Sequence, residues 1–307
     1  MSVAIELVIK IFFSMALGFF LYKIKMLNTT VNVSLSRFLV EVVVVCMTFT
    51  SIVSLDDEAE KSDVLLLLLI GVIIYVILIP ISLGLTRLLK TPAQSRGVYD
   101  CLMIFGNVGF IGLPIAESLY GNVGLFFMAI LNIHFNLLCY TLGFWLITKD
   151  NGKKQKMSLK SLINPGIIAI IIALIIFFCD IKIPDIVLSP FQFVGNITSP
   201  LALIVLGSSI AAHPLKMVFS QWRIYVLTFV RMIILPLAAF FICRSLLGPG
   251  MMTNIITLYV GMPSAVITGM FALAYGGDEE SATAGTAMMN IFCIITIPAI
   301  YLLTSTF

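Results

Sequence analysis

Ten long apolar segments follow one another along this 307-residue chain, and they constrain its fold more than any other feature. A bilayer core about 30 Å thick is crossed by a helix of about 20 apolar residues, which matches the length of these segments. Only 11 % of the residues are charged, too few to cover the surface of a water-soluble domain of this size. We therefore predict an all-α integral membrane protein with ten transmembrane helices. The expected spans are approximately 3–22, 36–54, 64–86, 98–118, 123–148, 164–179, 187–211, 222–246, 252–274 and 282–304.

Lys and Arg are distributed unevenly between the two sets of connecting loops. Loops that follow odd-numbered spans carry twelve of these residues, and loops that follow even-numbered spans carry three. Short loops rich in Lys and Arg stay in the cytoplasm during insertion. We therefore expect the odd-numbered loops to be cytoplasmic and both termini to lie outside the cell membrane.

The two halves of the chain resemble each other at an offset of about 156 residues, and such internal symmetry is typical of transporters. Ile24–Leu27 recurs as Ile181–Pro184, and Pro80 recurs as Pro236. Five spans per copy is an odd number, so the second copy enters the membrane from the opposite side and the repeat is inverted. The expected division is 1–150 for the first five-helix repeat, 151–163 for a cytoplasmic basic linker and 164–307 for the second repeat.

Spans 4 and 9 contain residues that interrupt helices. Gly106–Pro114 has three glycines and a proline, and its counterpart Gly261–Gly269 has two glycines and a proline. Glycine lets the backbone leave helical geometry, and proline removes an amide donor. Unwound backbone at membrane depth occurs where it is buried in protein or lines a cavity. Two interrupted helices in equivalent repeat positions predict the binding site of a transporter.

The same residues carry a family resemblance. Asn107–Ile115 followed by Leu119–Gly121 resembles the span 4 motif of the auxin efflux carrier family, which includes plant PIN carriers and bacterial malate and malonate permease-like proteins. Supporting segments occur along the whole chain: Arg37-Phe38, Asn164-Pro165, Leu203–Gly207, Met262–Ala265 and Thr296–Pro298. The short loop between spans 5 and 6 is similar to that of the bacterial members.

The resemblance implies a fold in which the broken spans 4 and 9 cross. Spans 1, 2, 6 and 7 would form a scaffold that makes a homodimer, and spans 3–5 and 8–10 would form a transport domain that moves organic anions by an elevator-like displacement. Asn107 would be the polar ligand, Pro114 the first helix breaker and Thr48 the span 2 residue facing the site. Where plant carriers have a second crossover proline, this chain has Thr268, which suggests a softer break. The candidate substrate-binding residues are Asn107, Val108, Gly109, Gly112, Pro114, Pro263, Ser264, Ala265, Thr268 and Thr48.

This arrangement suits an anionic substrate. A broken helix presents the positive end of its second half at the break, with free amides and a partial charge of roughly +0.5. Asn107 adds an amide donor, and Ser264 and Thr268 add hydroxyls that can donate to a carboxylate. Asn107 could instead only cap the first half-helix.

Three charged residues lie within or close to spans. Arg231 lies well inside span 8, so we expect it to face protein and to pair with an acid or with carbonyl groups. Asp100 and Glu41 lie near span ends, where a carboxylate reaches interfacial water. Asp100 is also a candidate for proton coupling.

Other classes of function fit less well. Membrane protease motifs and H-E-x-x-H are missing, so we do not expect an enzyme. Neither a cofactor, a metal nor a nucleic-acid partner is expected; the partners are the substrate anion, the bilayer and a second copy of the chain. An anion channel remains an alternative, because half-helices can line a pore. An ion-coupled antiporter on the same fold is another, although Asn107 and Thr268 replace the acids usual at such a crossing.

Overall fold

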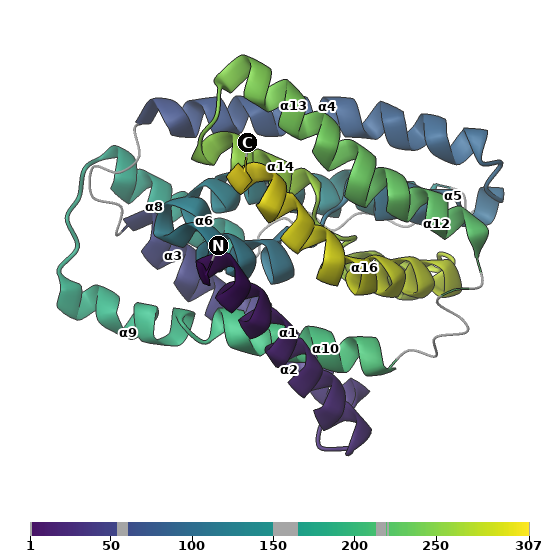
Figure 1. The fold of residues 1–307 in the computed structure, drawn as a ribbon, viewed down its shortest axis with the longest axis horizontal. Coiled ribbons are helices and arrows are strands. Elements are labelled where there is room, and N and C mark those ends of the chain that lie inside the picture. The colour runs from purple at the N-terminus through teal and green to yellow at the C-terminus, as the bar shows by residue number, and fades with distance from the viewer. Residues whose placement is uncertain (1, 54–60, 150–164, 213–218, 220, 307) are drawn as a thin grey trace. The chain divides into compact units, whose positions relative to one another are not determined.

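The computed structural model describes residues 2–53, 61–149, 165–212, 219 and 221–306, and the regular secondary structure in this part of the chain is helical (Figure 1). The chain divides into two compact units, each assembled from separate stretches of sequence. Unit 1 comprises residues 1–68, 109–133 and 163–212, and unit 2 comprises residues 69–108, 134–162 and 213–307. The expected linker 151–163 lies outside the described residues.

Helices occupy all ten expected segments, and several segments contain more than one helix. Unit 1 contains α1 (Ser2–Lys23), α2 (Thr29–Phe38), the π-helical turn η1 (Leu39–Val43), α3 (Val44–Val53), α8 (Pro165–Phe178), α9 (Asp185–Gly195) and α10 (Thr198–Ala212). Unit 2 contains α5 (Ala93–Ile104), η3 (Cys139–Gly143), α7 (Phe144–Thr148), α12 (Trp222–Phe229), η5 (Val230–Ile234), α13 (Leu235–Leu247), α14 (Met251–Val260), α15 (Ile267–Tyr275) and α16 (Glu279–Thr306). Three elements contribute residues to both units: α4 (Lys61–Leu88), η2 (Val108–Gly112) and α6 (Leu113–Leu138).

Six helical stretches of the described chain are long and apolar enough to cross a membrane. The longest, Val108–Thr148, has 41 residues, but it is divided at Gly121, whose φ of +66° is a left-handed conformation that glycine adopts easily. The protein is therefore a multi-pass membrane protein, and the number of ten crossings stays a prediction. The six stretches are Thr29–Val53, Lys61–Leu88, Val108–Thr148, Asp185–Ala212, Trp222–Leu247 and Glu279–Thr306.

In unit 1, α1 packs closely against α10 (Figure 1). A Cβ atom at Gly207 would lie 1.9 Å from the carbonyl oxygen of Met15, and one at Gly18 would lie 1.9 Å from that of Ile204. Each helix therefore presents a glycine to the backbone of the other, which is the small-residue packing common in membranes. A buried hydrogen bond of 2.8 Å from Ser208 to Asn32 ties α10 to α2.

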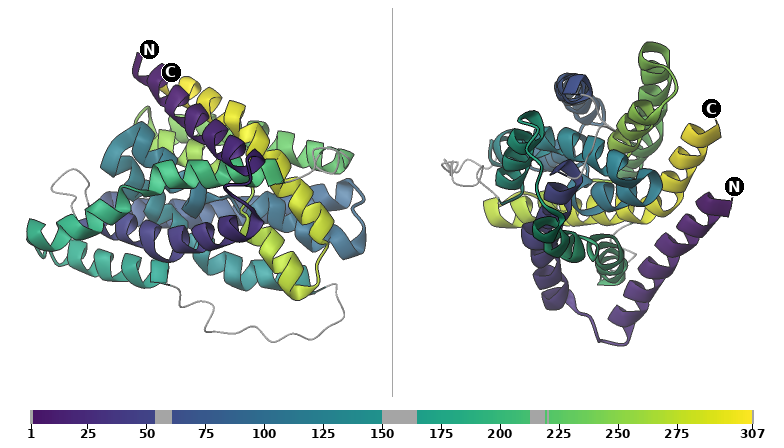
Figure 2. Two further views of the ribbon diagram at one scale, coloured as in Figure 1. Left: turned by 90° about the horizontal axis from the view of Figure 1, so that it is seen from below. Right: turned by 90° about the vertical axis from the view of Figure 1, so that its left-hand side faces the viewer.

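In unit 2, α5 packs against α7 and α16, and α14 packs against α13. Gly97 allows the contact between α5 and α7, since a Cβ atom there would lie 1.9 Å from the carbonyl oxygen of Leu146. The two views in Figure 2 show that α16 bends along its length, and Pro298 lies inside this helix. A proline in a helix removes one backbone hydrogen bond and clashes with the preceding turn, which accounts for the bend.

Both expected helix breaks are present. In span 4, α5 ends at Ile104 and Phe105 has an extended conformation (φ −98°, ψ 107°). The break precedes Pro114 by several residues, and Pro114 is the second residue of α6, directly after the π-helical turn η2. In span 9, α14 ends at Val260 and α15 begins at Ile267, so the break persists without a second crossover proline.

Candidate functional site

The two breaks, both in unit 2, are joined to each other by backbone hydrogen bonds. The amide of Asn107 donates to the carbonyl oxygen of Pro263 at 2.7 Å, and the amide of Ala265 donates to that of Phe105 at 2.9 Å. These bonds form an isolated antiparallel bridge between Gly106 and Ser264, which are 158 residues apart in sequence. Pairing with each other is how the unwound segments satisfy backbone groups that a helix would otherwise satisfy internally.

Three polar side chains at the paired breaks are buried without a hydrogen-bond partner among the described residues. They are Asn107, Ser264 and Thr268, with exposed fractions of 5 %, 0 % and 1 %. The unpaired atoms are the side-chain nitrogen of Asn107 and the two hydroxyl oxygens. A buried donor without an acceptor costs about 1–3 kcal/mol, so three of them around one backbone pairing mark a site that a ligand with acceptor atoms can satisfy.

Arg231 forms hydrogen bonds with the C-terminal ends of the two helices, α5 and α14, that precede the breaks. Its side chain is only 2 % exposed, Nε donates to the carbonyl oxygen of Met262 at 3.2 Å, and a terminal nitrogen donates to that of Met103. Met103 is in the last turn of α5 and Met262 follows the end of α14. A cation near a helix C-terminus is favoured by the helix dipole. The partners of Arg231 are therefore carbonyl groups of the two breaks.

The remaining guanidinium nitrogen of Arg231 lies beside the paired backbone. A Cβ atom added at Gly106 would stand 2.6 Å from it, so glycine is needed there for close approach. Arg231 comes from the π-helical turn η5, and π-turns within helices often occur at functional positions.

A pair of tyrosines that the sequence reasoning missed lies close to Arg231. The hydroxyls of Tyr75 on α4 and Tyr259 on α14 are 2.9 Å apart and buried, and both tyrosines interact electrostatically with Arg231. A tyrosine inside an apolar span needs a partner for its hydroxyl, and this requirement was the available signal. The partner itself, on a distant helix, could not be read from the sequence.

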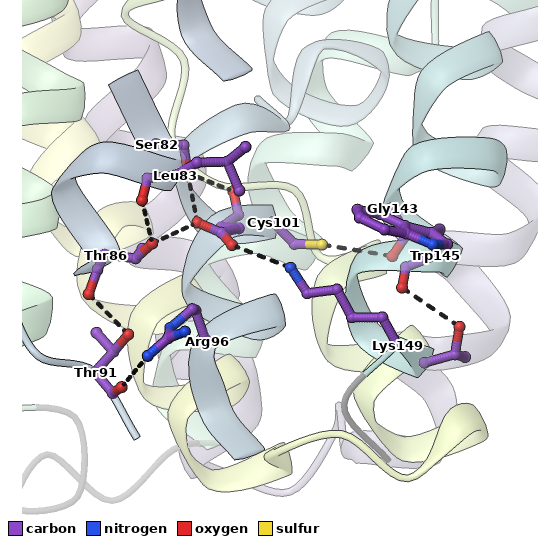
Figure 3. Close-up of polar contacts among 11 residues, drawn as sticks. Ser82, Leu83, Thr86, Thr91, Arg96, Cys101, Gly143, Trp145 and Lys149 are labelled. Carbon is purple, nitrogen blue, oxygen red and sulfur yellow. Dashed lines mark hydrogen bonds and ion pairs between the residues drawn. The ribbon is translucent and has the colours of Figure 1, made fainter. Parts of the chain in front are cut away.

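Asp100 is the centre of a second polar cluster in unit 2. Its carboxylate is fully buried, and one oxygen accepts hydrogen bonds from Thr86 at 2.8 Å and from Ser82 at 3.1 Å. The other oxygen is 3.9 Å from the ammonium group of Lys149. Figure 3 shows Ser82 and Thr86 on one side of this cluster and Lys149 extending toward it from the other. The cluster joins α4, α5 and the end of α7, and a coupling role for Asp100 stays a prediction.

Most of the other candidate residues belong to unit 1, and Val108 belongs to unit 2. Thr48 is buried in unit 1, where its carbonyl oxygen accepts a hydrogen bond from Ser51 at 2.9 Å. Glu41 forms an exposed ion pair of 2.9 Å with Arg37. Val108 begins η2, and its amide donates to the carbonyl oxygen of Gly106 at 2.8 Å. Gly109, Gly112 and Pro114 follow it in the part of the chain that belongs to unit 1. The structure thus brings together the candidate residues Asn107, Val108, Pro263, Ser264, Ala265 and Thr268 at the paired breaks.

Comparison with known protein families agrees with this architecture. The model of a family described as membrane transport protein matches residues 3–301. The chain belongs to this family. It is the auxin efflux carrier and membrane transport family that the span 4 motif resembles.

Similar proteins are also described as transporters. An uncharacterized transporter of Methanocaldococcus jannaschii is 24 % identical over 266 residues, which cover 83 % of this chain and 85 % of the relative. An uncharacterized transporter of Methanothermobacter thermautotrophicus is 22 % identical over 306 residues, or 95 % of this chain and 96 % of the relative. One of Escherichia coli is 26 % identical over 209 residues, covering 64 % of this chain and 65 % of the relative. The chain is therefore a membrane transporter of this family.

Proposed function

We propose that this transporter carries small organic anions, such as malate, malonate or auxin-like acids, and binds them at the paired breaks of unit 2. The observation that carries the proposal is the set of buried donors on Asn107, Ser264 and Thr268, which have no acceptor among the described residues. A carboxylate is an acceptor with two oxygens and about four lone-pair sites. A bound carboxylate would therefore supply the acceptor oxygens that these three donors lack.

The charges around the breaks favour the same ligand. Arg231 is a buried cation with no acidic partner in the described part of the chain, and its bonds go to neutral carbonyl oxygens. The helix α15 begins three residues after Ser264 and directs its positive end toward this segment. An anion would therefore be attracted by a fixed field without forming a tight ion pair, which suits a substrate that must also be released.

The transport mechanism we propose is an elevator in which spans 4 and 9 cross near the middle of the bilayer. The inverted repeat is supported by the two breaks, since Asn107 and Pro263, which are joined by a backbone hydrogen bond, are 156 residues apart in sequence, the same offset as between the two halves. Unit 1 includes the spans that the family resemblance assigns to the scaffold, which supports a division into scaffold and moving parts. Residues 109–133 also belong to unit 1, so boundaries between the units fall within spans 3, 4 and 5 and do not coincide with whole spans. Homodimerisation through the scaffold remains part of the proposal.

The proposal is tested by binding and uptake of organic acids. Purified protein is screened by thermal unfolding against mono- and dicarboxylates, and the best ligand is then used for uptake into proteoliposomes. Asn107→Ala removes one donor to a charged ligand, which is expected to cost about 1.5–3 kcal/mol, or roughly 10- to 150-fold in affinity. The unfolding temperature without ligand should change little, because the side-chain nitrogen of Asn107 has no partner to lose and its backbone amide keeps its bond to Pro263.

Asn254→Ala is the matched control, since Asn254 lies on α14 away from the break. It should bind and transport as the wild type does. Binding by Asn107→Ala with wild-type affinity would exclude Asn107 as a ligand. Stabilisation by amines but not by carboxylates would overturn the anion assignment.

A further inference from the structure

Unit 1 contains a cavity of about 160 Å³ that is separate from the paired breaks. It lies between the end of α3, the first turns of α6 and the end of α9. Its polar lining residues are Thr50, Ser51, Glu117, Asn122, Gln192 and Asn196. No lysine or arginine is among the residues that line it.

The hydroxyl groups of the lining point their protons away from the cavity. Thr50 donates to the carbonyl oxygens of Cys46 and Met47, both at 3.0 Å, and Ser51 donates to that of Thr48 at 2.9 Å. A hydroxyl that has used its proton keeps two lone pairs. Thr50 and Ser51 therefore offer the cavity acceptor oxygens.

Glu117 gives the cavity a negative charge. One carboxylate oxygen accepts a hydrogen bond of 2.9 Å from Ser199, and no ion pair to Glu117 occurs within the described ranges. Ser199 is in the first turn of α10, whose positive end favours the ionised carboxylate. The side chain is half-buried, so it reaches the cavity without losing all contact with water.

The end of α9 contributes backbone oxygen atoms next to the cavity. Gly195, its last residue, and Asn196, which caps it, both line the cavity. The dipole of α9 is offset here by α10, which begins three residues after Gly195, but carbonyl oxygens at the C-terminal ends of half-helices coordinate sodium ions in other transporters. The amide side chains of Asn122, Gln192 and Asn196 can add carbonyl oxygens to the lining.

We infer that this cavity binds one monovalent cation, sodium, with the Glu117 carboxylate as its charged ligand. A single carboxylate neutralises one positive charge, whereas hard divalent cations usually need more acidic ligands. The volume exceeds that of a bare ion and equals several waters at about 30 Å³ each, so the ion would keep part of its hydration shell. The inference does not depend on the proposed anion site, because no residue of the paired breaks lines this cavity.

The test measures thermal unfolding of the purified full-length protein in sodium chloride, potassium chloride, methylammonium chloride and choline chloride at equal ionic strength. Sodium is expected to raise the unfolding temperature in a saturable manner relative to choline. Glu117→Gln should weaken the apparent sodium affinity at least tenfold, because it removes the charged ligand. The matched control is Glu41→Gln, which changes an exposed carboxylate of the same unit and should leave the sodium response intact.

Thr50→Val provides a second variant if Glu117→Gln does not fold. Its hydroxyl bonds only to its own helix, so folding should survive while sodium affinity falls several-fold. Equal unfolding temperatures in sodium and choline would overturn the inference, as would an unchanged sodium response in both variants. A response to methylammonium without one to sodium would identify an amine site and overturn the assignment to sodium.

Discussion

A guanidinium enclosed in protein must have its donors occupied, and Arg231 meets this requirement with backbone carbonyls instead of an acid. The two bonded carbonyls, of Met103 and Met262, belong to the segments that lead into the breaks. The Arg231 side chain therefore links the two helix breaks through hydrogen bonds, and its positive charge is not neutralised by these carbonyl groups. The guanidinium of Arg231 thus stabilises the paired breaks and also supplies the positive charge that the proposed anion site needs.

Arg231→Met is expected to lower both stability and anion affinity. Two buried carbonyl oxygens would each lose a donor, at about 1–3 kcal/mol apiece. Arg223→Met is a matched control, because Arg223 also donates to two carbonyl oxygens, those of Leu89 and Lys90, but in a partly exposed position where water can replace it. Thermal unfolding should show a much larger loss for Arg231→Met. If both variants lost the same amount of thermal stability, the burial of Arg231 would not make its hydrogen bonds more important than those of Arg223.

The lowered pKa of Asp278 leads us to expect that the stability of the folded protein depends on pH. Burial alone would raise the pKa of this carboxyl, but hydrogen bonds from the Ser95 hydroxyl at 2.5 Å and from the Ser281 amide at 3.0 Å outweigh it and hold the pKa below its usual value. A pKa that is lower in the folded state gives stability that is present above the unfolded pKa of about 3.8 and is lost as the pH falls through the folded value.

Asp278→Asn should therefore be less stable than the wild type at neutral pH, by roughly 0.3–1 kcal/mol, because Asn keeps an acceptor oxygen for the Ser281 amide but removes the negative charge at the N-terminus of α16. The difference should shrink as the wild-type carboxyl is protonated in acid. Unfolding temperatures measured from pH 7 to pH 3 check this. A difference that stays constant over that range would show that the charge of Asp278 contributes nothing.

At the scale of elements, glycines set how closely helices approach. The sequence shows a glycine at position 207 inside an apolar span, but it does not name the partner helix, because the contact is made with Met15, almost 200 residues earlier in the chain. The same limit applies to the breaks. Glycine and proline predicted where the helices stop, whereas the hydrogen bonds from Asn107 and Ala265 depend on which segments meet in space.

Gly207→Ala is expected to separate α1 from α10. The added methyl carbon would stand 1.9 Å from a backbone oxygen that cannot move without moving its helix, so a loss of several kcal/mol or failure to fold is expected, beyond the 1–3 kcal/mol typical of overpacking. Gly84→Ala is the control, since nothing lies within 4 Å of the added carbon. Yield and thermal unfolding of the two variants are compared, and similar behaviour would contradict the close packing.

Asp100 joins three elements, and two substitutions separate its roles. Asp100→Asn keeps an acceptor oxygen for Ser82 and Thr86, whereas Asp100→Leu leaves both hydroxyls without it. We expect Asp100→Leu to be the less stable variant, by about 0.5–1.5 kcal/mol for each hydrogen bond lost, because the hydroxyls keep only their longer bonds to the backbone oxygens of Asp100 and Leu83. Thermal unfolding measures this order. Both variants lose the ion pair with Lys149, so the reverse order would show that an apolar side chain at this buried position stabilises the fold more than the two hydrogen bonds do.

At the scale of the whole molecule, the sequence predicted the helical class, the positions of the helices and the family, because hydropathy and the glycine-proline motifs are local signals. It did not predict how the chain divides. Unit 1 takes three separate stretches, including residues 109–133, and this depends on contacts between distant residues. Glu117 was missed for the same reason, since a carboxylate near a span end looks interfacial until the cavity around it is known.

The sidedness of the molecule is the last prediction, and two exposed lysines test it. Lys90 follows span 3 and Lys182 follows span 6, so the twelve-to-three distribution of basic residues places Lys90 in the cytoplasm and Lys182 outside. Cysteines are introduced at each position in a Cys179→Ser background, because native Cys179 is exposed near Lys182 in sequence. An impermeant maleimide should label Lys182→Cys in intact cells and Lys90→Cys only after permeabilisation. The opposite pattern would invert the topology, and labelling of both in intact cells would show that positions 90 and 182 face the same side, which the inverted repeat does not allow.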